Sequence, residues 1–228
     1  MVGGNVSNIN ILYEDNHLLV VEKPINMLSQ SDSTGDEDIL TLLKAYIKEK
    51  YNKPGNVYLG LVHRLDRMVG GVMVFAKTSK AAARLSKMIQ EDKFNKTYIA
   101  ICHGKVDKSG EFKDKIEKLE NGNSIISDKG KEAILKYELL KYDEENDISI
   151  VKIKLITGRH HQIRLQFSSR GFPLLGDHRY GIDKDNLPIA LYAYKLEFIH
   201  PVKQVSMNYE IAPKNYGYFK KYNVNNLL

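Results

Sequence analysis

The segment LVHRLDRMVGG, residues 61–71, places Arg64 and Asp66 two positions apart in a stretch that is otherwise largely apolar and ends in two glycines. On an extended strand both charged side chains would point to the same face, because side chains alternate with a period of two. They could then form a structural ion pair, or they could serve one site together. A carboxylate in such a site can attack a carbon or remove a proton only while it stays ionised.

Two familiar chemistries fit the polar residues poorly. HRLD differs from the catalytic loop of protein kinases, which needs Asp directly after Arg, a metal-binding Asn beyond it and an upstream Gly-rich loop. His160 and His161 are adjacent, so on a helix they would point about 100° apart, and no HExxH or CxxC spacing accompanies them. We therefore expect no metal. A metal-dependent nuclease using Asp66, His63 and His160 stays a distant alternative, because carboxylate clusters suited to magnesium are missing.

Charge is unevenly distributed along the chain, which carries a net charge of +6. Residues 1–62 hold five Lys against eight acidic residues, so the positive excess lies downstream. Residues 151–180 combine six basic side chains with one acid, Asp177, a local field that attracts polyanions. RNA or DNA is therefore the first partner to consider, although a Lys-rich surface also serves solubility.

The elements that must position these residues follow from periodicity and turn signals. The Ser/Asp/Gly loop after Pro24 precedes a helix with acidic residues at its start, and a second helix has Thr78 or Ser79 as its cap. Asp66 falls on a connection between strands. The predicted strands are two short strands within residues 11–24, around a turn at residues 14–16, and residues 59–62, 72–76, 96–104, 134–141, 148–156, 191–201 and 205–211. The predicted helices are residues 39–47, 78–92 and 158–171, the last stopped by Gly171.

Strands in adjacent runs with helices inserted between them favour an α+β fold, with a mostly antiparallel mixed central sheet flanked by helices. The 228 residues form one predicted domain, 1–228, or two closely joined lobes around a central cleft. No apolar run is long enough to cross a membrane, and the first ten residues do not resemble a signal peptide. The lone cysteine, Cys102, fits a reducing compartment, so we expect a cytoplasmic protein. The oligomeric state is not legible, and a monomer is the default expectation.

Several blocks, in order along residues 18–201, resemble the RluA-type family of RNA pseudouridine synthases. Each block is weakly specific by itself, whereas their common order and spacing make the resemblance specific. Too few residues precede the first block to build the small N-terminal RNA-binding domain of many relatives, so the resemblance is to members that lack it. The blocks are VVEKP (20–24), HRLD (63–66) with FAKTSKAA after it, KTYIA (96–100), TGRHHQIR (157–164) continuing into GFPLLGDHRYG, and FIHP (198–201).

The resemblance implies a pseudouridine-synthase-like catalytic fold and the isomerisation of uridine within ribosomal or transfer RNA. No redox change or group donor takes part, so no cofactor is implied. By the match of blocks, the essential aspartate is Asp66, the active-site tyrosine is Tyr98, and the basic partner of the aspartate is Arg164. Arg64 matches the position associated with base flipping.

Elementary chemistry supports these roles. Burial disfavours the charged form of Asp66, and a guanidinium such as Arg164 can compensate without losing its own charge. Tyr98 offers a flat face for the freed uracil and a hydroxyl that could assist removal of the C5 proton. A stacked target base must be extruded, and Arg64 could occupy the vacated space.

Further residues near these blocks are candidates for contact with RNA. They are His63, Arg67, Arg159, His161 and Gln162; the last three could equally be local caps. The basic stretch 151–180 would hold phosphates.

Two departures from the family pattern stand out. Many relatives have Thr-Ser-Gly where this chain reads Val69-Gly70-Gly71, and Tyr192 replaces a frequent His. The altered loop motivates an alternative function, a catalytically inactive RNA-binding or ribosome-assembly protein with the same fold.

Overall fold

The computed structural model describes residues 9–184, 186–213 and 216–228. The chain divides into two compact units, Met1–Phe94 with Lys195–Ile211 and Asn95–Tyr194 with Ala212–Leu228. The prediction that one domain spans the chain stays a prediction, and the absence of a signal peptide concerns residues that lie mostly outside the described ranges. Within those ranges, every helix is too short or too polar to cross a lipid bilayer.

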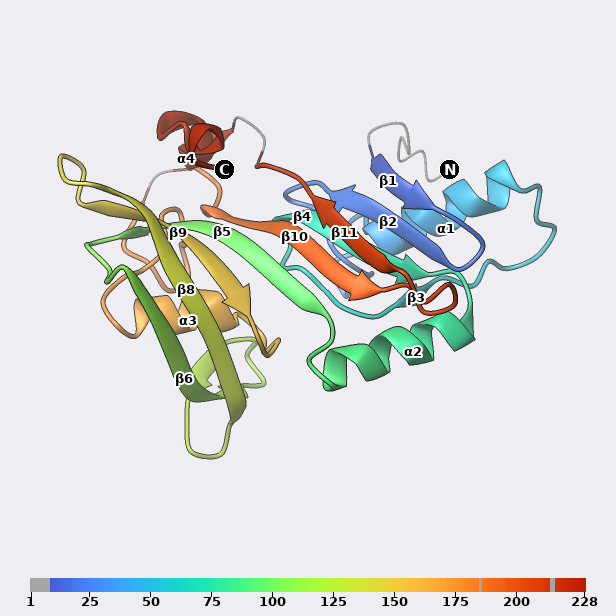
Figure 1. Ribbon diagram of the computed structural model, residues 1–228, viewed down its shortest axis with the longest axis horizontal. Coiled ribbons are helices and arrows are strands. Elements are labelled where there is room, and N and C mark those ends of the chain that lie inside the picture. Colours follow the sequence, from blue (N-terminus) through green and yellow to red (C-terminus); the bar gives the residue numbers. More distant parts are fainter. Residues whose placement is uncertain (1–8, 185, 214–215) are drawn as a thin grey trace. The chain divides into compact units, whose positions relative to one another are not determined.

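The first unit is a sheet with two helices (Figure 1). Its strand order is β1-β2-β4-β10, β3 pairs with β4, and β11 pairs with β10. The registered pairs β1·β2, β2·β4, β3·β4 and β10·β11 are all antiparallel. The elements are β1 (Asn10–Glu14), β2 (Leu18–Lys23), α1 (Ile39–Lys50), β3 (Gly60–Leu61), β4 (Gly70–Ala76), α2 (Ser79–Gln90), residues 195–199 of β10 (Leu191–Ile199) and β11 (Ser206–Glu210).

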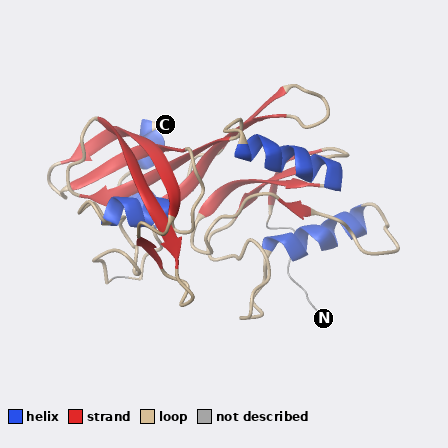
Figure 2. Cartoon of the chain, turned by 90° about the horizontal axis from the view of Figure 1, so that it is seen from below, coloured by secondary structure: helices blue, strands red, loops and turns tan. Residues whose placement is uncertain are grey.

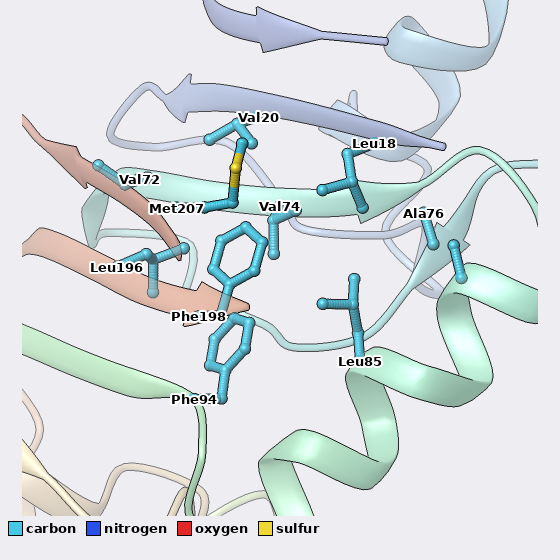
Figure 3. Close-up of a cluster of buried hydrophobic side chains, with 11 residues drawn as sticks. Leu18, Val20, Val72, Val74, Ala76, Leu85, Phe94, Leu196, Phe198 and Met207 are labelled. Carbon is cyan, nitrogen blue, oxygen red and sulfur yellow. The ribbon is translucent and has the colours of Figure 1, made fainter. Parts of the chain in front are cut away.

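Strands β2 and β4 are buried along their whole length because this sheet is covered on both faces. Figure 2 shows a helix on each side of these strands. Alternate residues of the two strands pack with α2 in one cluster (Figure 3), and the residues between them point to the opposite face. The cluster includes Leu18, Val20, Val72, Val74, Ala76, Ala81, Leu85, Phe94, Leu196, Phe198 and Met207. Coverage of both faces explains why the sequence shows continuous apolar runs here instead of alternation.

Side-chain caps fix the helix starts and the first hairpin as predicted. Asp38 Oδ1 accepts the Thr41 N–H at 2.9 Å to cap α1, and Thr78 Oγ1 accepts the Ala81 N–H at 3.2 Å to cap α2. Asp15 Oδ1 accepts two backbone N–H groups at 2.8 Å and closes the turn between β1 and β2. The predicted hairpin around residues 14–16 is confirmed.

The second unit has the strand order β10-β5-β9-β8-β6-β7, to which β10 contributes residues 191–194 (Figure 1). The predicted hairpin of β8 and β9 is confirmed, whereas β6, β7 and the C-terminal helices were not predicted. Helix α3 ends three residues before Gly171, where the helical pattern was expected to stop. The elements are β5 (Asn95–His103), β6 (Ser109–Lys118), β7 (Ser124–Ile126), β8 (Lys131–Asp143), β9 (Ile148–Leu155), α3 (Gln162–Ser168), α4 (Gly217–Lys221) and the 3-10 helix η2 (Val224–Leu227).

An aromatic cluster fastens α3 to the second sheet. The ring of Phe167 on α3 lies 5.1 Å from Phe112 and 5.7 Å from Tyr137, measured between centroids. Tyr137 is registered opposite Ile153, which is registered opposite Tyr98 on the next strand. Because directly paired residues share a face of a sheet, Tyr98 lies on the face that α3 covers.

Candidate active site

Asp66 lies on the connection between β3 and β4, as predicted, and not on a strand. The side chain of Leu65 is 7% exposed and belongs to the core, whereas Arg64 is exposed and Asp66 is half-buried. The Val69 N–H donates to the carbonyl of Asp66 at 3.0 Å and closes a turn after the aspartate. The apolar residue between the two charges thus anchors the loop, and the charges lie at its surface.

Lys23, the last residue of β2, is fully buried, and its ammonium group interacts electrostatically with the carboxylate of Asp66. Its Nζ donates to the carbonyls of Pro24, Met27 and Arg67 at 2.9, 2.7 and 3.2 Å. Burial lowers the pKa of Lys23 to about 7, and the negative charge of Asp66 opposes this shift. Sequence reasoning gave Lys23 no role of its own; the available signal was a lysine ending an apolar strand just before proline.

His63 and Arg67, both predicted to contact RNA, have partners inside the first unit. His63 Nε2 accepts the Val74 N–H at 3.1 Å, so this side chain ties the loop to β4. Arg67 donates from Nε to Asn26 Oδ1 at 3.0 Å and from Nη1 to Asp36 Oδ2 at 2.5 Å. These bonds give both residues a structural role, and their contacts with RNA stay a prediction.

The segment Val69-Gly70-Gly71, where this chain departs from the Thr-Ser-Gly of the family pattern, joins the loop of Asp66 to β4. Val69 is 2% exposed, so its side chain fills the core. Gly71 has a φ of +126°, a conformation that only glycine adopts readily. The loop therefore enters β4 through a buried valine and a glycine that the backbone conformation requires.

Arg164 on α3 forms a two-bond ion pair with Asp177 in the second unit. Its Nε donates to Asp177 Oδ2 at 2.8 Å and its Nη2 to Oδ1 at 2.7 Å. Burial opposes the charge of Asp177, but Arg164 and the backbone N–H groups of Tyr180 and Arg179 lower the pKa of its carboxyl below the usual value. Asp177 was not predicted as a site residue, although it is the single acid in the basic stretch and stood out there for that reason.

The TGRHHQIR block is held together by Gln162, which is 3% exposed. Its Oε1 accepts from Thr157 Oγ1 at 2.8 Å and from the Arg159 N–H at 3.0 Å, and its Nε2 donates to Gln166 at 3.1 Å. This geometry supports the local-cap interpretation of Gln162. The side chain of Arg159 donates from Nε to the carbonyl of Glu132 at 2.7 Å.

The rings of the two histidines of the block contact each other, with centroids 3.7 Å apart and planes tilted by 31°. His160 Nδ1 lies 2.9 Å from Ser124 Oγ, and His161 Nδ1 lies 2.9 Å from the hydroxyl of Tyr180. His161 itself has a φ of +55° at the start of α3. Among the described residues, no group of three His, Cys, Asp or Glu side chains lies close enough to hold a metal ion.

The positive field expected from the six basic side chains of residues 151–180, set against Asp177 alone, is partly neutralised in the fold. Arg164 pairs with Asp177, and Arg170 Nη1 lies 2.9 Å from Asp114 Oδ2 on β6. Lys152 Nζ lies over the ring of Tyr194, 5.8 Å from its centroid. Asp114 lies outside the stretch, so counting charges along residues 151–180 overstated the field available to phosphates.

The residues predicted from the sequence for catalysis and base flipping thus form two groups. Tyr98 and Arg164 lie in the second unit, on the side of its sheet where α3 packs. Asp66 and Arg64 lie in the first unit, on one loop. Because Asp66 and Arg164 belong to different units, their pairing stays a prediction.

Comparison with known proteins adds to this geometry. The sequence model of the family described as RNA pseudouridylate synthase matches residues 17–169, more than half of the chain. A protein of Aquifex aeolicus described as an uncharacterized RNA pseudouridine synthase is 36% identical over 217 residues, which cover 89% of this chain and 69% of that protein. The Ribosomal large subunit pseudouridine synthase C of Rickettsia bellii is 33% identical over 189 residues, covering 81% of this chain and 60% of the relative.

Solved structures have the same fold. The human RNA Pseudouridylate Synthase Domain Containing 4 aligns with a TM-score of 0.76 at 24% identity, covering 96% of this chain and 92% of that one. The human RNA Pseudouridylate Synthase Domain Containing 1 aligns with a TM-score of 0.72 at 23% identity, over 93% and 86% of the two chains. The predicted α+β class with a mostly antiparallel sheet is confirmed.

Proposed function

Because the chain belongs to the RluA-type family of RNA pseudouridine synthases, isomerases that act on RNA, we propose that it converts uridine to pseudouridine within ribosomal or transfer RNA. The bond from ribose C1′ to uracil N1 breaks, the ring turns, C5 bonds to C1′, and the C5 proton is lost while N1 gains one. Relatives named as ribosomal large subunit pseudouridine synthases C and D favour ribosomal RNA as the substrate.

The observation that carries the proposal is the placement of the exposed Arg64 and the half-buried Asp66 on either side of the buried Leu65. Asp66 acts at the sugar, either by attacking C1′ or by removing the C2′ proton. Arg64 is the long planar side chain of this loop that can replace an extruded base in the stack. A carboxylate and a guanidinium held on one anchored loop suit an isomerisation that needs charge and position but no cofactor.

The second unit supplies the other two proposed catalytic side chains. Tyr98 stacks on the freed uracil, and Arg164 stabilises the charge of Asp66. Asp177 supports this role, because two hydrogen bonds fix the plane of the Arg164 guanidinium. We also propose that the protein works in the cytoplasm, in keeping with its single free, buried cysteine.

The test is tritium release from RNA labelled at C5 of uridine, since C5 loses its hydrogen only when it bonds to C1′. We expect release by the wild type and none by Asp66→Asn, with RNA binding retained because the positive contacts remain. Asp107→Asn, which changes an exposed aspartate of the second unit, is the matched control and should leave release unchanged. Binding without release by the wild type on any cellular RNA would instead favour the inactive RNA-binding alternative.

A further inference from the structure

The hydroxyl of Ser29 binds both backbone groups of Leu65. Ser29 Oγ donates to the Leu65 carbonyl at 2.7 Å and accepts the Leu65 N–H at 3.1 Å. Ser29 is 5% exposed, and both bonds are buried. Because residues 62–69 form no strand, no neighbouring strand satisfies the backbone N–H and carbonyl of Leu65. The hydroxyl of Ser29 bonds to both groups instead.

These two bonds lie on either side of the residue that separates Arg64 from Asp66. The N–H of Leu65 belongs to the peptide group that joins it to Arg64, and its carbonyl belongs to the peptide group that joins it to Asp66. Fixing both peptide planes fixes the directions in which the two charged side chains leave the backbone. Ser29 therefore acts on the aim of Arg64 and Asp66 without touching either side chain.

The backbone next to Ser29 is held in place by helix α1. The carbonyl of Leu28, the residue before Ser29, accepts a hydrogen bond from the N–H of Ile39, the first residue of α1, at 2.9 Å. Downstream of Asp66, other groups hold the loop: Lys23 Nζ binds the Arg67 carbonyl, and the Val69 N–H binds the Asp66 carbonyl. Within the described residues, Ser29 is the group that holds the backbone immediately before Asp66.

We infer that Ser29 is a positioning residue for the isomerisation, resting on the role proposed above for Asp66. A displacement of about 1 Å at a reacting group can lower a rate by roughly 100-fold. Removing the hydroxyl frees the two peptide groups of Leu65 to rotate. The chemical step should then slow, while the basic side chains that bind RNA stay in place.

The experiment compares Ser29→Ala with Ser149→Ala. Ser149 is a matched control in the second unit, because it too is buried, donates to a carbonyl (Gly104, 2.7 Å) and accepts a backbone N–H (Val106, 3.2 Å). The unfolding midpoint of each variant is measured first. Single-turnover tritium release and RNA affinity are then measured at a temperature below both midpoints, where both variants are folded. Ser29→Thr, which keeps the hydroxyl, is the rescue variant.

We expect Ser29→Ala to lower the single-turnover rate by about 10- to 100-fold, with RNA affinity within about threefold of the wild type and a midpoint shift similar to that of Ser149→Ala. Ser149→Ala should keep the wild-type rate, and Ser29→Thr should recover most of it. A wild-type rate in Ser29→Ala, or an equal loss of rate in Ser149→Ala, would overturn the inference while Asp66→Asn still tests the proposed function. A wild type that releases no tritium would overturn the proposed function, and this inference with it.

Discussion

Asp177 holds the guanidinium of Arg164 by two hydrogen bonds, at 2.8 and 2.7 Å, while its own side chain is completely buried. Arg164 also lies over the ring of Tyr180, 5.3 Å from the centroid. The guanidinium is thus fixed in plane and direction by the GDHRYG segment that follows α3. An arginine held in this way can present charge to a partner without losing side-chain entropy at each turnover.

Asp177→Asn should cost both stability and rate. The substitution leaves the largely buried guanidinium of Arg164 without its charge partner, which typically costs about 3 kcal/mol in the free energy of unfolding. The turnover rate should fall at least about tenfold, because Arg164 is no longer held in one orientation. Urea denaturation and single-turnover tritium release check the two effects.

The control for this variant is Glu111→Gln, which breaks the exposed pair of Glu111 and Lys136. Exposed ion pairs contribute little, so neither stability nor rate should change appreciably. If Asp177→Asn also left both quantities unchanged, Arg164 would have no place in the active centre.

The charge state of Lys23 should make stability depend on pH. Burial lowers its pKa to about 7 against Asp66, from 10.5 for an ordinary lysine. Between these values the unfolded chain holds a proton that the folded protein has lost, so the free energy of unfolding rises with pH, by up to about 1.4 kcal/mol per unit. Stability from this group is complete above pH 10.5 and is lost as the pH falls through 7.

Urea denaturation from pH 6 to 10 measures this slope. Lys23→Met removes the titrating group, so its curve should rise less steeply than that of the wild type. In Asp66→Asn the rise should begin at a lower pH, because the charge that favours protonated Lys23 is gone. Parallel curves for all three proteins would show that Lys23 does not titrate in this range.

Gly71→Ala should destabilise the protein at the entry to β4. The φ of +126° at Gly71 disfavours any side chain, and such strain costs on the order of 1–3 kcal/mol. Thermal unfolding should show a lower midpoint for this variant. Gly55→Ala is the control, since Gly55 has no positive φ and a Cβ there would meet nothing within 4 Å. Equal midpoints for the two variants would mean that the backbone at Gly71 relaxes without cost.

Local signals explain which parts of the fold were predictable. Strands β2 and β4 are continuous apolar runs, and Asp15, Asp38 and Thr78 are caps whose hydrogen bonds reach only two or three residues along the chain. Strand β6 escaped prediction because its burial alternates among charged residues, with Phe112 and Ile116 as its only buried positions. Helix α3 was overextended at both ends, because Gly171 was expected to stop it, whereas the helix begins at Gln162 and ends at Ser168, and turns follow as far as Gly171.

The sequence by itself determined the family and the order of its blocks, and it placed Asp66 on a loop beside Arg64. These depend on residue type and spacing, which a linear chain displays directly. Only the tertiary structure decided that Lys23 and Ser29 hold that loop, that Asp177 pairs with Arg164, and that the side chain of Gln162 bonds within the block of residues 157–164. Each of these interactions joins a polar side chain to a polar group that folding brings next to it. The sequence shows the residue type of a polar side chain, but it does not show which buried partner will satisfy its hydrogen bonds.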